Sequence, residues 1–242
     1  MSSVLPRLGA AAAAVLAPAA APATASAPAS QHRADRLGPD AASAASDGWA
    51  PQAIVIGASA GGVDALLRLL GGLPADFAPA VLVVLHRPRG PVDPAASLAS
   101  LLGARCALPV RDAWDREPVR GGQVLIAPPD YHLLVDPGPV ASLSVDEPVL
   151  YSRPAIDPLF ESAAAVWGPA LLAIVLSGAS ADGTAGARVV RRRGGRVWVQ
   201  DPAEAAVPTM PQAALAGAGA DAVWGLAAMA GPLQSEPFRS RR

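Results

Sequence analysis

From Trp49 onward, short runs of consecutive apolar residues alternate with segments whose apolar residues recur every three or four positions. The short runs predict strands buried on both faces, because a strand with one exposed face would alternate apolar and polar residues. These runs cover residues 54–56, 81–85, 124–127, 171–176, 197–200 and 220–224. The recurring segments predict amphipathic helices, with stripes at Val63, Leu66, Leu67 and Leu70 and at Ile156, Leu159, Phe160, Ala163 and Trp167.

This alternation predicts an α/β fold, namely a doubly wound, mainly parallel sheet with helices on both faces. Residues 121–145 depart from the pattern, since apolar runs at 124–126, 133–135 and 143–145 are separated by turns rich in Pro, Asp and Gly. Short strands joined by such turns pair with their neighbours in opposite directions. We therefore expect an antiparallel hairpin appended to the sheet.

The chain divides by composition into three parts. Residues 49–234 have the length and apolar content of one catalytic domain, and residues 235–242 are expected to be a frayed tail. Residues 1–48 are dominated by Ala, Pro and Ser, which predicts a low-complexity leader or a disordered tail. Arg7, the apolar run 8–17 and the small residues 25–27 also fit a secretory signal peptide, and a misassigned start codon is a further alternative. No run approaches the roughly 18 apolar residues that a membrane span needs.

Charge and cysteine content exclude several classes of function. The net charge is −1, and all 19 basic residues are arginine, so there is no cationic excess of the kind that binds nucleic acid. The single cysteine, Cys106, rules out an intrachain disulfide and a Cys-x-x-Cys metal pair. The sequence therefore predicts no metal, no cofactor and no nucleic-acid partner.

The segment Gly57-x-Ser59-x-Gly61 follows the first predicted strand and leads into the first predicted helix. Glycines permit a sharp reversal there, and the first turn of a helix offers backbone N–H groups that have no partner within the helix. A serine in such a turn is typical of a nucleophile. Ser59 is therefore the candidate nucleophile, although so short a motif needs partners to support it.

A serine nucleophile requires a base and a carboxylate that orients the base. His86 directly follows the strand at 81–85, and Asp182 lies in the small-residue loop after the strand at 171–176. Since the carboxyl ends of parallel strands meet at one edge of the sheet, we expect Ser59, His86 and Asp182 to lie together. The alternatives are a hydrogen-bonded histidine at a strand end and an N-cap aspartate for the following helix. His132 is expected to be structural or to line a pocket.

Three other aspartates are interpreted as structural. Asp64 is expected in the first turn of a helix, Asp157 as an N-cap before Pro158, and Asp201 in a turn. The resulting order Ser, His, Asp differs from the Ser, Asp/Glu, His order of α/β-hydrolases, which disfavours an ordinary lipase or esterase.

Six blocks, in order, resemble the catalytic domain of the chemotaxis protein-glutamate methylesterases (CheB type). They are 56–62 (IGASAGG), 85–88 (LHRP), 126–133 (IAPPDYHL), 153–160 (RPAIDPLF), 176–183 (LSGASADG) and 210–214 (MPQAA). The resemblance implies hydrolysis of glutamate methyl esters on chemoreceptors, with deamidation of receptor glutamine as a related activity. It implies Ser59 as nucleophile, His86 as general base and acid, and Asp182 as the orienting carboxylate.

Further expectations follow from this resemblance. The backbone N–H groups at Ala60 and Ala179 are candidates for an oxyanion hole. Arg153 either contacts an acidic substrate or pairs with a local carboxylate. The chain departs from the family at Ala60, where Thr is common, and at Ala179-Ser180, where Met-Gly is common.

Residues 1–48 are too short for the receiver domain that many members carry, which leaves a separate response regulator as a partner. The cytoplasm is the expected location, because a signal peptide in residues 1–27 would carry the enzyme away from cytoplasmic receptor esters.

Two other functions compete with this one. A catalytically silent module that binds receptors or signalling partners through the same cleft would not need Ser59, His86 and Asp182. A dinucleotide-binding domain would use the turn at 57–62 for phosphate, but the Gly-x-Gly-x-x-Gly spacing is absent.

Overall fold

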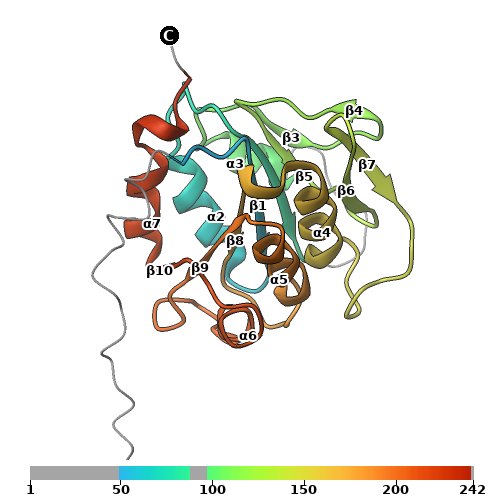
Figure 1. The fold of residues 1–242 in the computed structure, drawn as a ribbon, viewed down its shortest axis with the longest axis vertical. Coiled ribbons are helices and arrows are strands. Elements are labelled where there is room, and N and C mark those ends of the chain that lie inside the picture. The colour runs from blue at the N-terminus through green and yellow to red at the C-terminus, as the bar shows by residue number, and fades with distance from the viewer. Residues whose placement is uncertain (1–48, 88–96, 241–242) are drawn as a thin grey trace, which may run out of the picture. The chain divides into compact units, whose positions relative to one another are not determined.

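The computed structural model describes residues 49–87 and 97–240 (Figure 1). The leader predicted for residues 1–48 lies outside the described residues. Within the two described stretches, no helix is long and apolar enough to cross a membrane.

Seven parallel strands form the main sheet, in the order β10-β9-β8-β1-β2-β5-β3 (Figure 1). Their bounds are β1 Ala53–Ala58, β2 Ala80–Leu85, β3 Val110–Asp112, β5 Val124–Ile126, β8 Leu171–Val175, β9 Arg196–Gln200 and β10 Ala222–Trp224. Every residue of β1, β2, β5 and β8 is buried. The predicted doubly wound parallel sheet is confirmed.

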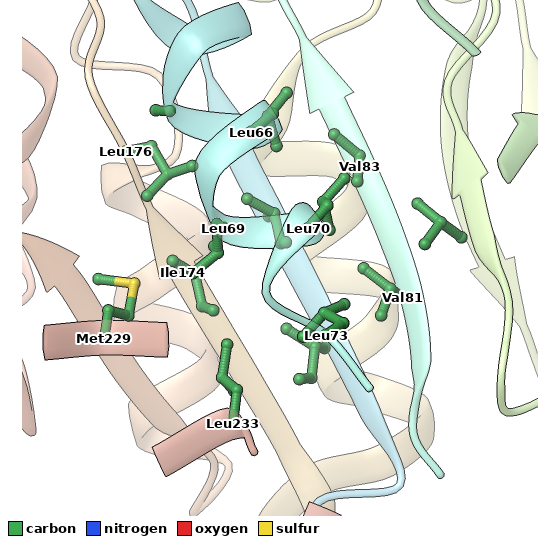
Figure 2. Packing of buried hydrophobic residues seen from close by; sticks show 14 of the residues in the cluster. Leu66, Leu69, Leu70, Leu73, Val81, Val83, Ile174, Leu176, Met229 and Leu233 are labelled. Carbon is green, nitrogen blue, oxygen red and sulfur yellow. The ribbon is translucent and has the colours of Figure 1, made fainter. Parts of the chain in front are cut away.

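Helices cover both faces of this sheet. One face packs against α2 (Gly62–Gly71), α3 (Leu98–Gly103) and α7 (Leu226–Leu233), and the other against α4 (Ile156–Trp167), α5 (Thr184–Arg192) and α6 (Thr209–Gly217). Figure 2 shows Leu66, Leu69 and Leu70 of α2 pointing onto the strands, with Ile174 of β8 and Met229 of α7 beside them. The buried face of α2 is therefore rotated from the predicted stripe, since Val63 is 37% exposed.

A small antiparallel sheet lies beside α4, with the order β4-β7-β6. Its strands are β4 (Glu117–Pro118), β6 (His132–Asp136) and β7 (Val140–Ser144). The predicted hairpin is present as β6 and β7, but the apolar run at 124–126 belongs to the main sheet as β5. That run lies between β2 and β3, and all three of its residues are buried, as is typical of a central strand.

The segment after α7 is packed against the domain and is not a frayed tail over the described residues. This segment contains a short 3-10 helix at Glu236–Phe238, and a similar one follows α4 at Gly168–Ala170. Phe238 is 2% exposed and stacks on Phe77 at a ring-centroid distance of 6.0 Å. Arg239 also pairs with Asp76 at 2.8 Å. One buried aromatic ring therefore fixes a segment whose composition alone predicts disorder.

The order of the strands reverses at β1, which has β2 on one side and β8 on the other. In open parallel sheets, functional groups gather beyond the carboxyl ends of the strands at such a point. The loops after β1, β2 and β8 begin at Ser59, His86 and Leu176 respectively.

Candidate active site

The turn after β1 is closely packed, and its glycines have distinct roles. Gly61, the N-cap of α2, has a left-handed backbone with φ of 76°. A Cβ at Gly57 would lie 2.5 Å from Cγ2 of Ile156, and one at Gly62 would lie 2.7 Å from Cβ of Ala58. Side chains at these positions would thus displace α2 and the start of α4 from the end of β1.

His86 lies beside this turn because β1 and β2 pair in register. Ala58 is opposite Leu85, and the backbone N–H of His86 donates to the carbonyl of Ala58 at 3.0 Å. Ser59 and His86 are therefore the next residues on two strands about 4.8 Å apart. Within the described residues, Ser59 Oγ makes no hydrogen bond. Catalytic hydrogen bonds of this kind often close only when substrate binds.

The His86 ring contacts Asp182, with Nε2 2.7 Å from Oδ2. The His86 side chain is 10% exposed and that of Asp182 is fully buried. Because Nε2 is occupied by the carboxylate, Nδ1 is the ring nitrogen left for a second partner. The predicted meeting of these two side chains at one edge of the sheet is observed.

Asp182 is held by three backbone N–H donors besides His86. Its Oδ2 accepts from Ile156 N at 2.6 Å, and its Oδ1 accepts from Asp157 N at 3.0 Å and from Gly183 N at 2.9 Å. The alternative of an N-cap for the following helix is not observed, since Gly183 is the N-cap of α5. Asp182 instead caps α4, a helix that begins 26 residues earlier.

Ser177 and Gly178, which sequence reasoning did not single out within the loop of Asp182, join this loop to the nucleophile turn. Ser59 N donates to the carbonyl of Ser177 at 2.9 Å, and Ser177 Oγ donates to the carbonyl of Ala60 at 2.7 Å. A Cβ at Gly178 would lie 2.9 Å from Ser59 Cβ and 2.6 Å from Met210 Cε. In the sequence, both residues could have been noticed as a hydroxyl residue and a glycine that directly follow a predicted buried strand.

Ala60 and Ala179, the candidates for oxyanion binding, lie in the two loops that Ser177 connects. Both residues are exposed, and neither backbone N–H donates a hydrogen bond within the described stretches. An unoccupied N–H directly after Ser59 and another in the loop that contacts Ser59 fit the chemistry of an oxyanion hole, which needs N–H groups that no other acceptor occupies.

Arg153 is engaged locally. Its Nη1 donates to the carbonyls of Val145 at 2.6 Å and Asp146 at 3.1 Å, and its Nη2 lies 3.9 Å from Asp130. The peptide bond between Arg153 and Pro154 is cis. Backbone carbonyls thus hold Arg153, while the expected local carboxylate, Asp130, lies at the longer distance, and contact with an acidic substrate stays a prediction.

His132 is structural in its placement, being 2% exposed at the start of β6. Its Nδ1 accepts from the backbone N–H of Ala155 at 3.1 Å. The ring proton must therefore lie on Nε2, which donates to the carbonyl of Glu147 at 3.2 Å. His132 thus orients the backbone just before the N–H groups that bind Asp182.

Of the three aspartates interpreted as structural, two have the predicted role and one does not. Asp64 lies in the first turn of α2, and Asp201 accepts from Ala203 N at 2.9 Å within a turn, as expected. Asp157 is not an N-cap, because α4 begins one residue earlier with Ala155 in the cap position. The chain before Pro158 is already helical, and the Asp157 carboxylate contacts α5.

Comparisons with known proteins agree with this geometry. The CheB methylesterase family model matches residues 54–233. A relative from Leptospira interrogans (strain Fiocruz L1-130), provisionally named a protein-glutamate methylesterase/protein-glutamine glutaminase, is 36% identical over 72% of this chain and 89% of its own length. A protein-glutamate methylesterase/protein-glutamine glutaminase 2 from Cereibacter sphaeroides is 43% identical over 72% of this chain and 47% of its own.

Solved structures include a similar domain. The crystal structure of the Thermotoga maritima CheB methylesterase catalytic domain matches with a TM-score of 0.71 and 33% identity, covering 76% of this chain and 97% of that chain. The strand order and the match of the family model to residues 54–233 agree with this similarity. This chain belongs to the CheB methylesterase family.

Proposed function

We propose that this chain is a protein-glutamate methylesterase that also deamidates glutamine, and that Ser59, His86 and Asp182 carry the reaction. The contact of 2.7 Å between His86 and Asp182, on the strand next to Ser59, is the observation that supports it most. A neutral imidazole held by a buried carboxylate is a general base for a neighbouring hydroxyl.

In the first half-reaction, Ser59 Oγ attacks the carbonyl carbon of the glutamate methyl ester while its proton passes to Nδ1 of His86. The negative charge moves to the carbonyl oxygen, which the N–H groups of Ala60 and Ala179 stabilise. The bond to methoxide then breaks, and His86 returns the proton to give methanol. The product is an acyl-enzyme ester on Ser59.

In the second half-reaction, His86 removes a proton from water, which attacks the acyl carbon. Ser59 leaves with that proton, and the glutamate side chain is released as an acid. With a glutamine substrate the same steps release ammonia in place of methanol. Asp182 stabilises the imidazolium that forms in each half-reaction.

The proposed substrate is a chemoreceptor-like protein in the cytoplasm. This proposal is supported by the family of the chain and by the names of its relatives as protein-glutamate methylesterases. A separate response regulator is the proposed source of control.

The test is release of methanol from methylated receptor cytoplasmic fragments by the full chain. We expect Ser59→Ala to lower the rate at least about 10³-fold, because the nucleophile is lost. Ser240→Ala is the matched control, since this exposed serine lies in the C-terminal segment. A folded parent protein that releases no methanol would refute the proposal and favour the binding module.

A further inference from the structure

Helices α4 and α5 each lack an N-cap side chain of their own. Their N-cap residues are Ala155 and Gly183, and neither makes a side-chain cap hydrogen bond. Each helix is instead capped by a carboxylate that belongs to the other. Asp182, just before α5, accepts from the first N–H groups of α4, and Asp157 Oδ1 in α4 accepts from Gly186 N in α5 at 2.7 Å. We call this arrangement the reciprocal cap.

We infer that Asp157 supports the acid–base pair of His86 and Asp182 in two ways, as a positioning residue within the reciprocal cap and through the negative charge of its carboxylate. This inference rests on the proposed function. Asp157 binds Asp182 with its backbone N–H and Gly186 of α5 with its carboxylate, so it holds both Asp182 and the first turn of the helix that follows it. Its carboxylate also interacts electrostatically with the carboxylate that contacts His86.

Close packing makes the reciprocal cap rigid. A Cβ at Gly186 would lie 2.5 Å from Phe160 Cβ and 3.1 Å from the Asp157 carbonyl oxygen. A Cβ at Gly183, whose φ is 91°, would lie 2.9 Å from Ile156 Cγ2. Two glycines thus allow α4 and α5 to approach until each carboxylate reaches the other helix.

A charged Asp157 carboxylate in the reciprocal cap lowers the stability of the folded protein. Burial, together with the charges of Asp182 and Glu161, raises the pKa of Asp157 from 3.8 to about 6, although the hydrogen bonds from the N–H groups of Gly186 and Gly183 oppose the change. An asparagine would accept the same hydrogen bond from Gly186 without that cost. A perturbed carboxyl group retained beside a reactive pair is typical of a functional site.

The negative charge of Asp157 should stabilise the transition state of the proposed reaction. His86 becomes a cation in the transition state, and nearby negative charge stabilises a cation. Above about pH 6 Asp157 supplies that charge through Asp182, and below it Asp157 takes up a proton and the support is lost. Asp157 therefore helps to set the acid limb of the activity.

The first experiment compares pH–rate profiles of the parent, Asp157→Asn and Glu161→Gln. We expect Asp157→Asn to lower kcat about 3- to 10-fold at pH 7.5 with KM unchanged, a range typical of coupled neighbours, and to change the acid limb. Glu161→Gln removes an exposed charge from the same helix and should leave kcat within about twofold. An Asp157→Asn profile identical to that of the parent would overturn the inference.

The second experiment needs no activity. The carboxyl carbon of Asp157 is followed by NMR through pH 4–9 in the parent and in Asp182→Asn. We expect a midpoint near about 6 in the parent, lowered by about half a pH unit or more in the variant, since coupling between two charges is reciprocal. An unchanged midpoint would overturn the inference. An inactive parent with a lowered midpoint would refute only the proposed function.

Discussion

Replacing Asp157 by asparagine should stabilise the protein at neutral pH while it slows the reaction. The pKa of Asp157 is raised from 3.8 to about 6 in the folded protein, so the folded state holds this proton more tightly than the unfolded chain does. Below pH 3.8 the group is protonated in both states and costs nothing. As pH rises from 3.8 to about 6, the unfolded chain loses this proton more readily than the folded state, which must bear a partly buried anion, so stability falls and then levels off.

The magnitude follows from the difference between the two pKa values. At about 1.4 kcal/mol per pH unit, a rise from 3.8 to about 6 corresponds to a cost of up to about 3 kcal/mol above pH 6. The asparagine side chain would keep an acceptor for Gly186 N and remove the charge. We expect Asp157→Asn to raise the free energy of unfolding by about 1–3 kcal/mol at pH 7.5 and by much less at pH 4.5.

Urea denaturation at several pH values between 4.5 and 8, followed by tryptophan fluorescence, measures this difference. Trp198 and Trp224 are buried and 4.8 Å apart, so they report loss of the core. A gain that is the same at every pH would refute the electrostatic reasoning. A parent protein more stable than Asp157→Asn at pH 7.5 would show that the charged hydrogen bond outweighs burial.

Three further predictions concern backbone strain and packing. Leu150 and Tyr151 have positive φ of 47° and 66° in a turn, so Leu150→Asn with Tyr151→Gly should raise stability by about 1–2 kcal/mol in thermal unfolding; no gain would contradict strain there. Gly61→Ala should cost about 1–3 kcal/mol in urea, because φ is 76° and a methyl group would meet its neighbours, whereas the open position Gly231→Ala should not destabilise. Phe160→Ala, at a fully buried position, should cost about 3–5 kcal/mol by the same assay, and a loss below about 1 kcal/mol would contradict tight packing around α4.

Part of the candidate site could be predicted without coordinates. The strands 54–56 and 81–85 are short apolar runs, and such runs predict neighbouring parallel strands whose carboxyl ends share an edge. His86 directly follows the second run and Ser59 lies three residues after the first, so their proximity depends mainly on the register of one strand pair. Local pattern is sufficient there because a serine or histidine one residue past a strand has little freedom to lie elsewhere.

The roles of other residues depended on contacts between distant segments. Nothing in the local sequence of Asp182 indicates that it caps a helix 26 residues earlier, because its own loop leads into α5. The same holds for Asp157, which lies before a proline and resembles an N-cap in sequence but accepts from Gly186 in the structure. Arg153 likewise donates to the carbonyls of residues 145 and 146, which neither of its two expected roles included.

The α/β class, the parallel sheet and the edge at which the reactive groups gather could therefore be predicted from hydrophobic periodicity, since this periodicity reports which faces are buried. Three features required the folded chain, namely which carboxylate caps which helix, the pairing of β4 with the hairpin, and the stacking of Phe238 on Phe77. A hydrogen bond or an aromatic contact between remote segments depends on how closely their backbones approach. That approach is set by glycines and side-chain volumes on both partners together, as at Gly183 and Gly186.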